Sequence, residues 1–173
     1  MEISNFCTFI AMSYIEPSQL MLRRTDRSDL EALFRIQLDP EAIHMAAFTS
    51  ADPSDQRAYM EKYGKHLQDP LINMQTVILD QEIIGSIAKF ERNGEAEITY
   101  WIDRSFWGKG IATMTLQKFL SSEPARPLFG RVAFDNIGSR KVLEKCGFVE
   151  WGTDRGFANA RRAEIEEIIY RLE

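Results

Sequence analysis

Residues 101–116 read WIDRSFWGKGIATMTL, which joins the end of a predicted strand to a turn with two glycines and the start of a predicted helix. Gly108 and Gly110 suit a tight turn of this kind, because glycine adopts positive φ values without steric cost. The first backbone N–H groups of a helix lack intrahelical partners, and the helix dipole gives them partial positive charge. Pyrophosphate oxygens fit such a place. The segment is therefore a candidate phosphate-binding turn, with an ordinary strand-to-helix turn as the alternative.

Two common nucleotide-binding motifs do not match this turn. A Walker A loop needs a glycine five residues before Gly108 and a Ser or Thr after Lys109, where the chain has Asp103 and Gly110. A dinucleotide-binding fingerprint needs a further glycine at the position of Thr113. Both nucleotide-binding interpretations are excluded by spacing.

The strand before the turn alternates between two faces, as period-two patterning predicts. The apolar face carries Ala96, Ile98, Tyr100 and Ile102. The opposite face carries Glu95, Glu97, Thr99 and Trp101. Asn93-Gly94 immediately before this strand is a strong hairpin signal, because both residues tolerate positive φ.

The rest of the chain predicts strands and helices in mixed order, which is typical of an α/β (α+β) single domain. Strands are expected at residues 19–24, 75–79, 83–90, 95–102, 128–134, 148–151 and 165–172. Helices are expected at residues 26–38, from residue 52, after the glycine turn, and at residues 136–146.

Local signals fix the expected ends of these helices. Ser28 and Glu31 have the spacing of a capping box. Asp39-Pro40 should end the first helix, because the residue before proline avoids helical geometry. Asp52-Pro53 should open the second helix, with aspartate as the cap and proline in the first turn. Gly147 suits the left-handed residue that ends the helix before it.

Composition limits the function classes. The chain of 173 residues is 45% hydrophobic and 27% charged, an ordinary globular mixture that suits one domain. Its formal net charge of -5 disfavours a general nucleic-acid binder. No apolar run reaches the ~20 residues that a membrane-spanning helix requires, so no membrane partner is expected.

The cysteines and the first residues point to the cytoplasm. Cys7 and Cys146 are too few for a disulfide framework and lack metal-ligand spacing, so free thiols in a reducing compartment are expected. Residues 1–15 lack a basic n-region and carry Glu2, which argues against a signal peptide.

A second informative stretch, residues 135–148, reads DNIGSRKVLEKCGF. Together with residues 96–102 and 106–113, it resembles the GCN-related N-acetyltransferase (GNAT) superfamily, and most closely the branch of ribosomal-protein N-terminal acetyltransferases. The resemblance implies an acyl-CoA N-acyltransferase fold over residues 19–173, preceded by an extension at residues 1–18. That fold is a mixed, mostly antiparallel sheet flanked by helices, in which parallel strands 4 and 5 splay apart and admit the pantetheine arm of acetyl-CoA.

The resemblance also implies which residues bind acetyl-CoA. The backbone of residues 101–103 would pair with pantetheine like an added strand, and the amides of residues 107–112 would hold the pyrophosphate. Ser105 departs from the family, which often has Gln or Arg there. Charged side chains and the start of the next helix complete the set. The expected cofactor-binding residues are Trp101, Ile102, Asp103, Arg104, Trp107, Gly108, Lys109, Gly110, Ile111, Ala112, Asn136, Ser139, Arg140 and Lys141.

Asn136 and Ser139 match the family's Asn-x-x-Ser at the start of a helix. A plain helix cap is the alternative for Asn136, whereas the resemblance implies a pantetheine contact. In this branch a serine at the place of Ser139 hydrogen-bonds the cofactor sulfur and helps to protonate the leaving thiolate. Other branches use a tyrosine where this chain has Leu143.

Acetyl transfer to nitrogen needs a neutral amine. At pH 7 a lysine with a pKa of ~10.4 is neutral in about one molecule per few thousand, whereas an α-amine with a pKa near ~8 is neutral in about one in ten. Glu97 resembles the family's base position and could take the proton directly or through water. An exposed strand carboxylate is the alternative, and Glu95 is an equally charged neighbour.

Five further basic or titratable residues are weaker candidates, and all of them except His66 stand in segments that form the walls of the acceptor site in relatives. An ordinary solvated role is the simpler interpretation for each. They are His44, His66, Arg155, Arg161 and Arg162, of which the three arginines are expected in the loop before the last strand.

The sequence therefore predicts an N-acetyltransferase that moves an acetyl group from acetyl-CoA to a primary amine by direct attack in a ternary complex, without a metal. The acceptor stays open between a protein N-terminal α-amine and a small amine such as a polyamine or a cationic antibiotic. A non-catalytic CoA-binding regulatory domain is the alternative from another class. The oligomeric state is open, with a homodimer as one option.

Overall fold

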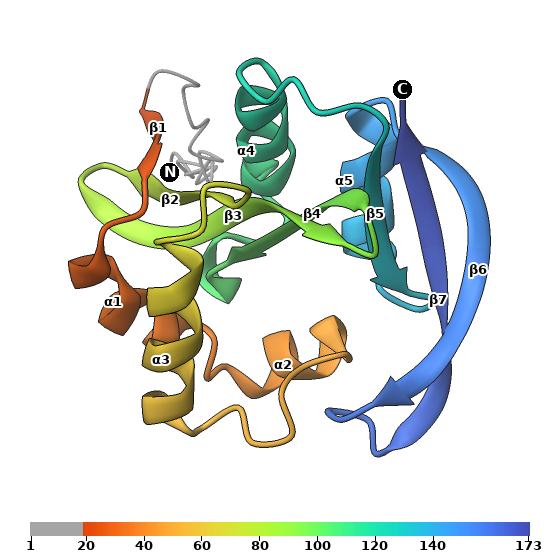
Figure 1. Ribbon diagram of the computed structural model, residues 1–173, viewed down its shortest axis with the longest axis horizontal. Coiled ribbons are helices and arrows are strands. Elements are labelled where there is room, and N and C mark those ends of the chain that lie inside the picture. The colour runs from red at the N-terminus through yellow and green to blue at the C-terminus, as the bar shows by residue number, and fades with distance from the viewer. Residues whose placement is uncertain (1–18) are drawn as a thin grey trace, which may run out of the picture.

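The computed structural model describes residues 19–173, which form one seven-stranded sheet with helices on both faces (Figure 1). The strand order across the sheet is β1-β2-β3-β4-β5-β7-β6. The strands are β1 Leu20–Arg24, β2 Asn73–Leu79, β3 Glu82–Arg92, β4 Glu95–Ile102, β5 Leu128–Ala133, β6 Val149–Ala158 and β7 Ala163–Leu172. The α-helices are α1 Leu30–Ile36, α2 Pro40–Ala46, α3 Gln56–His66, α4 Ile111–Leu120 and α5 Ile137–Lys145. Short 3-10 helices lie at Arg27–Asp29 (η1) and Arg104–Phe106 (η2). The extension expected at residues 1–18, including Cys7, lies outside the described residues.

Two apolar clusters hold the helices against opposite faces of the sheet. On one face, Leu116 and Phe119 of α4 and Leu143 of α5 are buried in the larger cluster, together with strand residues such as Ile98. On the other face, α1 and α3 are buried against β2. That smaller cluster contains Leu30, Leu33, Phe34, Tyr59 and Met74. The amphipathic helix patterns therefore correspond to two layers of helices around one sheet.

Strands β4 and β5 are parallel but pair only briefly. Their register covers Ala96 with Leu128, Glu97 with Phe129, and Ile98 with Gly130. β4 continues to Ile102, so its last four residues have no strand partner on the side of β5. On its other side β4 stays paired with β3 along its whole length. The expected splay of strands 4 and 5 is confirmed.

One glycine allows β3 and β4 to stay close beside this opening. A Cβ atom on Gly85 would lie 2.1 Å from the carbonyl oxygen of Trp101, which is too close for any other residue. The end of β4 is therefore held tightly on the β3 side while it is open on the β5 side.

The structure corrects two expected helix starts. Asp26, and not Ser28, caps the first helical segment, in a capping box completed by Asp29. Asp39-Pro40 ends the first helix as expected, but it also opens α2, which the sequence analysis did not predict.

The second correction concerns Asp52-Pro53, which does not begin a helix. The Asp52 carboxylate instead accepts hydrogen bonds from the backbone and hydroxyl of Ser54, which closes a local turn. Asp55 caps α3 three residues later. Asp and Ser favour both turns and caps, so the dipeptide alone does not decide between them.

The last two strands are longer than expected. β6 and β7 pair from Val149–Arg171 to Ala158–Ala163, so β6 continues past its expected end at residue 151 to residue 158, while β7 begins at residue 163 instead of residue 165. Arg155 therefore lies within β6 and not in the loop, whereas Arg161 and Arg162 lie in the turn. Polar residues continue these strands because backbone pairing, and not burial of alternate side chains, defines this outer part of the sheet.

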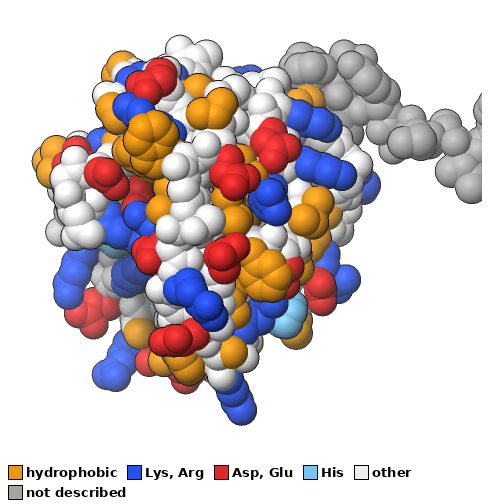
Figure 2. All heavy atoms as spheres, turned by 90° about the vertical axis from the view of Figure 1, so that its right-hand side faces the viewer, with side chains coloured by type: hydrophobic (Ala, Val, Ile, Leu, Met, Phe, Trp, Pro, Cys, Tyr) orange, Lys and Arg blue, Asp and Glu red, His pale blue; other side chains and the backbone are white. Residues whose placement is uncertain are grey.

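The surface on the β6 and β7 side is chemically mixed. Figure 2 shows Lys and Arg side chains intermixed with Asp and Glu on this side, with hydrophobic side chains between them. The edge strand β6 itself exposes Val149, Trp151 and Phe157. Within residues 19–173, no helix is long and apolar enough to cross a membrane.

Candidate active site

A cavity of about 1040 Å³ occupies the opening between β4 and β5. Its walls come from β4, the glycine turn, the start of α5, α2, α3 and parts of β5 and β7. Eleven of the fifteen residues expected at the site line it: Glu97, Trp101, Ile102, Trp107, Gly108, Gly110, Ile111, Ala112, Asn136, Ser139 and Lys141. Segments that are far apart in the sequence thus meet at one place.

The other four expected residues lie outside the cavity wall and have protein partners. The Asp103 carboxylate accepts a hydrogen bond from the backbone of Ser105 and so caps η2. Arg104 forms an ion pair with Asp39, with 2.8 Å between its Nε atom and the carboxylate. The ammonium of Lys109 lies 5.4 Å from the ring centre of Phe106. Arg140 donates to the hydroxyl of Tyr170 and lies near Glu150.

The glycine turn leaves the start of α4 without a side-chain cap. Gly108 has φ 73° and Gly110 has φ 78°, values that other residues adopt only with strain. Gly110 is the N-cap of α4, and no side chain accepts from the first-turn amides. By contrast, α2, α3 and α5 are capped by Asp39, Asp55 and Asn136. The amides at the start of α4 therefore remain available beside the cavity.

Trp107 fixes the turn relative to the end of β4. Its indole Nε1 donates to the carbonyl oxygen of Ile102 at 2.8 Å. The open edge of β4 and the uncapped start of α4 are thereby held at a constant separation. This arrangement can bind an extended chain along the strand and an anion at the helix.

Ser139 lies on the α5 side of the opening, next to Tyr100 from the apolar face of β4. The hydroxyl oxygen of Tyr100 is 2.7 Å from Oγ of Ser139 and 3.2 Å from its carbonyl oxygen. Burial raises the pKa of Tyr100, so the phenol stays neutral. The alternation of β4 put Tyr100 on the apolar face of the strand, but it did not indicate that the hydroxyl of Tyr100 contacts Ser139.

Asn136 uses both of its polar side-chain atoms within the protein. Its Oδ1 accepts from the backbone N–H of Ser139 at 3.0 Å, which is the helix cap considered above. Its Nδ2 donates to the carbonyl oxygen of Met45 at 3.1 Å, at the end of α2. The expected pantetheine contact of Asn136 stays a prediction.

On the opposite face of the sheet, Glu97 belongs to a buried charged cluster. Glu97 is only 3% exposed, and its Oε1 accepts from Nε of Arg131 at 2.9 Å. Its Oε2 lies 3.4 Å from Nε of Arg92. Arg131 also donates to Glu167 at 3.2 Å, and burial raises the pKa of this second carboxyl group. The cluster places two carboxylates, joined by one guanidinium, on the cavity wall.

Sequence reasoning missed Arg131 and Glu167. Arg131 could have been noticed, because it is a charged residue in the otherwise apolar run LFGRVAF of residues 128–134. Glu167 had no such signal, since it follows other glutamates in EIEEII. Its place on the cavity wall depends on the pairing of β7 with β5, where Glu167 lies opposite Ala133.

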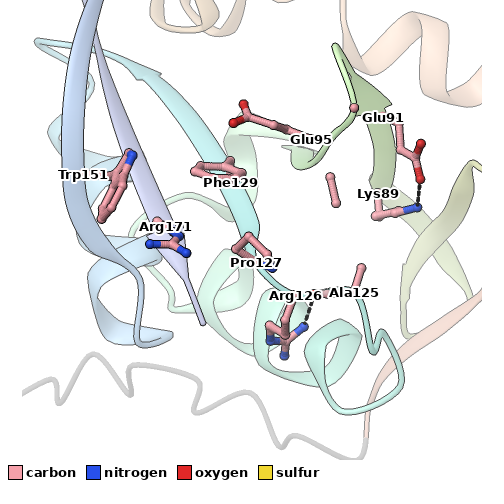
Figure 3. A pocket seen from close by; sticks show the side chains of 11 residues that line it. Lys89, Glu91, Glu95, Ala125, Arg126, Pro127, Phe129, Trp151 and Arg171 are labelled. Carbon is pink, nitrogen blue, oxygen red and sulfur yellow. Dashed lines mark hydrogen bonds and ion pairs between the residues drawn. The ribbon is translucent and has the colours of Figure 1, made fainter.

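Glu95 and Glu97 line different cavities, because Glu95 lines a second cavity of about 660 Å³. It lies near the start of β4 and β5, and Figure 3 shows the Glu95 carboxylate pointing away from the paired Lys89 and Glu91. None of the expected catalytic or cofactor-binding residues lines it. Glu95 therefore does not compete with Glu97 for a place in the larger cavity.

The remaining candidates are dispersed. His66 lines the larger cavity, and burial lowers its pKa. Arg161 donates to the carbonyl oxygen of His44 and forms an ion pair with Asp135. Arg155 and Arg162 lie exposed on the β6–β7 hairpin. Among residues 19–173, no three His, Cys, Asp or Glu side chains are grouped closely enough to hold a metal ion.

Comparisons with known proteins identify the family and the fold. The acetyltransferase (GNAT) domain family matches residues 19–149. The N-acetyltransferase p20 of Bacillus licheniformis is 26% identical over 173 residues, which cover 93% of this chain and 96% of that protein. Among solved structures, the ribosomal L7/L12 alpha-N-protein acetyltransferase RimL in complex with coenzyme A has a TM-score of 0.79 at 21% identity and covers 90% of this chain and 94% of its own. Spermidine N-acetyltransferase from Vibrio cholerae, in complex with CoA and spermine, has a TM-score of 0.73 at 25% identity, with 89% and 96% covered.

Proposed function

The chain belongs to the GNAT acetyltransferase family, and on that basis we propose that it transfers an acetyl group from acetyl-CoA to a primary amine by direct attack in a ternary complex. One observation carries the proposal. The opening between β4 and β5 has Ser139 on one side and the cluster of Glu97, Arg131 and Glu167 on the other. An amine and a thioester that enter from opposite faces of the sheet would therefore meet between a proton donor and a proton acceptor.

Acetyl-CoA would bind along the open edge of β4 and at the start of α4. The pantetheine arm would lie against residues 101–103, where β4 has no partner on the β5 side. The pyrophosphate would accept hydrogen bonds from the uncapped amides at residues 110–112. Lys141 lines the same cavity and would add positive charge, whereas Arg104 already neutralises Asp39.

In the proposed reaction the amine nitrogen attacks the thioester carbonyl carbon. Glu97 takes the proton of the amine directly or through water, and Arg131 holds Glu97 beside a second carboxylate, Glu167. A backbone N–H near Trp101 or Ile102 stabilises the oxyanion. Ser139 assists the departure of the thiolate.

No covalent enzyme intermediate takes part in this proposal. Cys146 lies outside the cavity wall, with its Sγ 3.7 Å from the carbonyl oxygen of Thr113. Burial raises the pKa of Cys146 to about 11, so at neutral pH it is a thiol and a poor nucleophile.

The acceptor end of the cavity favours an amine that also carries an oxygen. Two wall residues, Tyr59 and Trp101, have a buried hydroxyl and a buried indole N–H without a partner among the described residues. A carbonyl or carboxylate oxygen that reached either group would supply the hydrogen bond that it lacks. Glu97 already pairs with the guanidinium groups of Arg92 and Arg131, so it is poorly placed to bind a second ammonium group of a substrate. These features suit an α-amine next to a carbonyl group, as in a peptide or an amino acid.

A polyamine is the second candidate acceptor. The net charge of -5 would attract a cation, and the spermidine acetyltransferase of Vibrio cholerae has the same fold at 25% identity. A protonated polyamine, however, supplies no acceptor for Tyr59 or Trp101.

The test is an acceptor panel with release of free thiol from acetyl-CoA as the measurement. The panel compares short peptides with free N-termini, the same peptides with blocked N-termini and an internal lysine, amino acids, and spermidine. We expect thiol release with the free α-amines, because these are more often neutral at pH 7. Preferential turnover of spermidine would show that the acceptor is a polyamine and not an α-amine. Tight binding of acetyl-CoA without turnover of any amine, or acetylated Cys146 on the reaction path, would overturn the proposed reaction.

A further inference from the structure

The hydroxyl of Tyr100 is the group nearest to Ser139 that the proposed reaction does not yet use. Tyr100 comes from β4 and Ser139 from the first turn of α5, and both line the cavity. Their hydroxyl oxygens are 2.7 Å apart, and the tyrosine oxygen is 3.2 Å from the carbonyl oxygen of Ser139. The carbonyl oxygen and the hydroxyl of Ser139 thus have the same hydrogen-bond partner, the hydroxyl of Tyr100.

This geometry allows two hydrogen-bond arrangements, because a phenol has one proton and can also accept. When Tyr100 donates to the carbonyl oxygen of Ser139, its own oxygen accepts the serine proton, which then points away from the cavity. When Tyr100 donates to Oγ of Ser139, the serine proton is free to point at a group in the cavity. The two arrangements differ only in rotation of two hydroxyl groups.

We propose that Tyr100 is a positioning residue for the departure of the thiolate, which holds the Ser139 hydroxyl so that its proton can be directed at the cofactor sulfur. The inference rests on the proposed function, since it assigns Tyr100 to a step of that reaction. Without the phenol, the Ser139 hydroxyl would turn back to a carbonyl oxygen of its own helix, as serines in helices commonly do.

The proton balance makes Tyr100 a director of the proton and not its source. The N–C bond forms and the C–S bond breaks, and the sulfur takes the proton of Ser139 Oγ. Ser139 regains a proton from solvent, while the proton of the amine leaves to solvent through the carboxylates on the other face. The buried phenol keeps its own proton throughout, which agrees with its raised pKa.

The alternative is that Tyr100 only anchors α5 to the sheet. Tyr170 provides a matched control, because it also ties α5 to a strand. Its hydroxyl donates to Glu144 at 2.8 Å and accepts from Arg140 at 3.1 Å, and Tyr170 does not line the cavity. A merely structural role would give Tyr100→Phe and Tyr170→Phe similar effects.

The experiment compares Tyr100→Phe, Tyr170→Phe, Ser139→Ala and the Tyr100→Phe/Ser139→Ala double variant with two acyl donors. One donor is acetyl-CoA, and the other is its analogue with selenium in place of sulfur, whose selenolate leaves without help because selenols are stronger acids than thiols. With acetyl-CoA, we expect Tyr100→Phe to lower kcat about tenfold or more while KM for acetyl-CoA stays within about twofold. The loss should largely disappear with the selenium donor. In the double variant the loss should not exceed that of Ser139→Ala alone, because both substitutions remove one unit.

Each other outcome overturns the inference. If the losses of Tyr100→Phe and Ser139→Ala multiply, or if Tyr100→Phe is equally slow with both donors, Tyr100 does not act through Ser139. If wild-type protein turns over no amine, the proposed function fails and this inference fails with it. Thermal unfolding checks that Tyr100→Phe is folded. If Tyr100→Phe does not fold, Ser139→Ala provides the test. Its lower kcat with acetyl-CoA should return toward the wild-type value with the selenium donor. If it does not, Ser139 does not protonate the leaving group and Tyr100 has no such step to direct.

Discussion

At the scale of single residues, the site depends on how the protein manages buried charge. Glu97 is 3% exposed and would be costly to ionise alone, but Arg131 and Arg92 each contact one of its oxygens. Arg131 in turn pairs with Glu167, whose pKa burial raises. These contacts with Arg131 and Arg92 also fix the direction of the Glu97 side chain on the cavity wall. A carboxylate at the acceptor face is therefore available without a rearrangement.

Replacing Glu97 tests whether this carboxylate accepts the amine proton. We expect Glu97→Gln to lower kcat about 100-fold, because general-base catalysis usually contributes at least that much. KM for acetyl-CoA should change little, because Glu97 lies on the opposite face of the sheet from Ser139. Steady-state kinetics with the preferred amine provide the measurement.

Glu95→Gln is the matched control, since Glu95 lies on the same strand but lines the second cavity. Its kinetics should remain at the wild-type level. If Glu97→Gln is as active as the control, the base is another group, and Glu167→Gln becomes the decisive variant.

At the scale of the elements, the turn between β4 and α4 is built from backbone conformation. Gly108 and Gly110 have positive φ, and a Cβ atom on either would meet nothing within 4 Å. Glycine is therefore required at these two positions by the positive φ values and not by a steric clash with neighbouring atoms. The turn presents the first amides of α4 uncapped, and Trp107 ties it to Ile102.

Gly110→Ala tests the role of this turn in cofactor binding. A left-handed conformation costs an alanine about 1–2 kcal/mol, so the turn should relax away from its present shape. We expect the Kd for acetyl-CoA, measured by calorimetry, to rise about tenfold, because the amides of α4 would no longer converge.

Gly94→Ala controls for the strain itself. Gly94 has φ 82° and equally open surroundings, but it lies in the β3–β4 turn, away from the larger cavity. Its thermal stability should fall by a similar amount while the Kd stays unchanged. Equal weakening of binding by both substitutions would refute a specific role for the turn.

At the scale of the whole molecule, α2 and the segment after it form one wall of the cavity because distant parts of the chain hold them. Arg161 donates to the carbonyl oxygen of His44 at 2.6 Å, and Asn136 donates to that of Met45 at 3.1 Å. Asn159 donates to the carbonyl oxygen of Thr49 at 2.7 Å. The wall thus depends on the β6–β7 turn and on the start of α5.

The ion pair between Arg161 and Asp135 joins these two anchors and should depend on pH. The hydrogen bond from Arg161 lowers the pKa of Asp135. A lowered carboxyl pKa stabilises the fold above the pKa of the unfolded chain, and this contribution is lost as pH falls through the folded value. We expect Asp135→Asn to lower the free energy of unfolding by up to about 1 kcal/mol at pH 7. The difference from wild type should vanish in acid below about pH 3.

Urea unfolding at both pH values measures this prediction. Arg161→Gln provides the control, because adding Asp135→Asn to that background should cost little more at pH 7. A loss from Asp135→Asn that is the same at pH 7 and in acid would show that the ion pair is not its cause.

Sequence alone determined the features that local backbone and side-chain preferences govern. β4 runs over the expected residues 95–102, Gly147 ends α5 with φ 88°, and the turn at Gly108 and Gly110 has the expected positive φ values. These features rest on alternation, on glycine's lack of a Cβ atom, and on capping, all of which act within a few residues. The same local rules could not choose between Asp39-Pro40 and Asp52-Pro53 as a helix start.

Only the tertiary structure determined which residues contact each other at the site. The sequence marked Glu97 and Ser139, but their partners Arg131 and Tyr100 follow from strand register and from the packing of α5 on the sheet. Glu167 reaches the cavity only because β7 lies between β5 and β6. Such contacts join residues dozens of positions apart, and no short-range preference encodes which strand lies beside which.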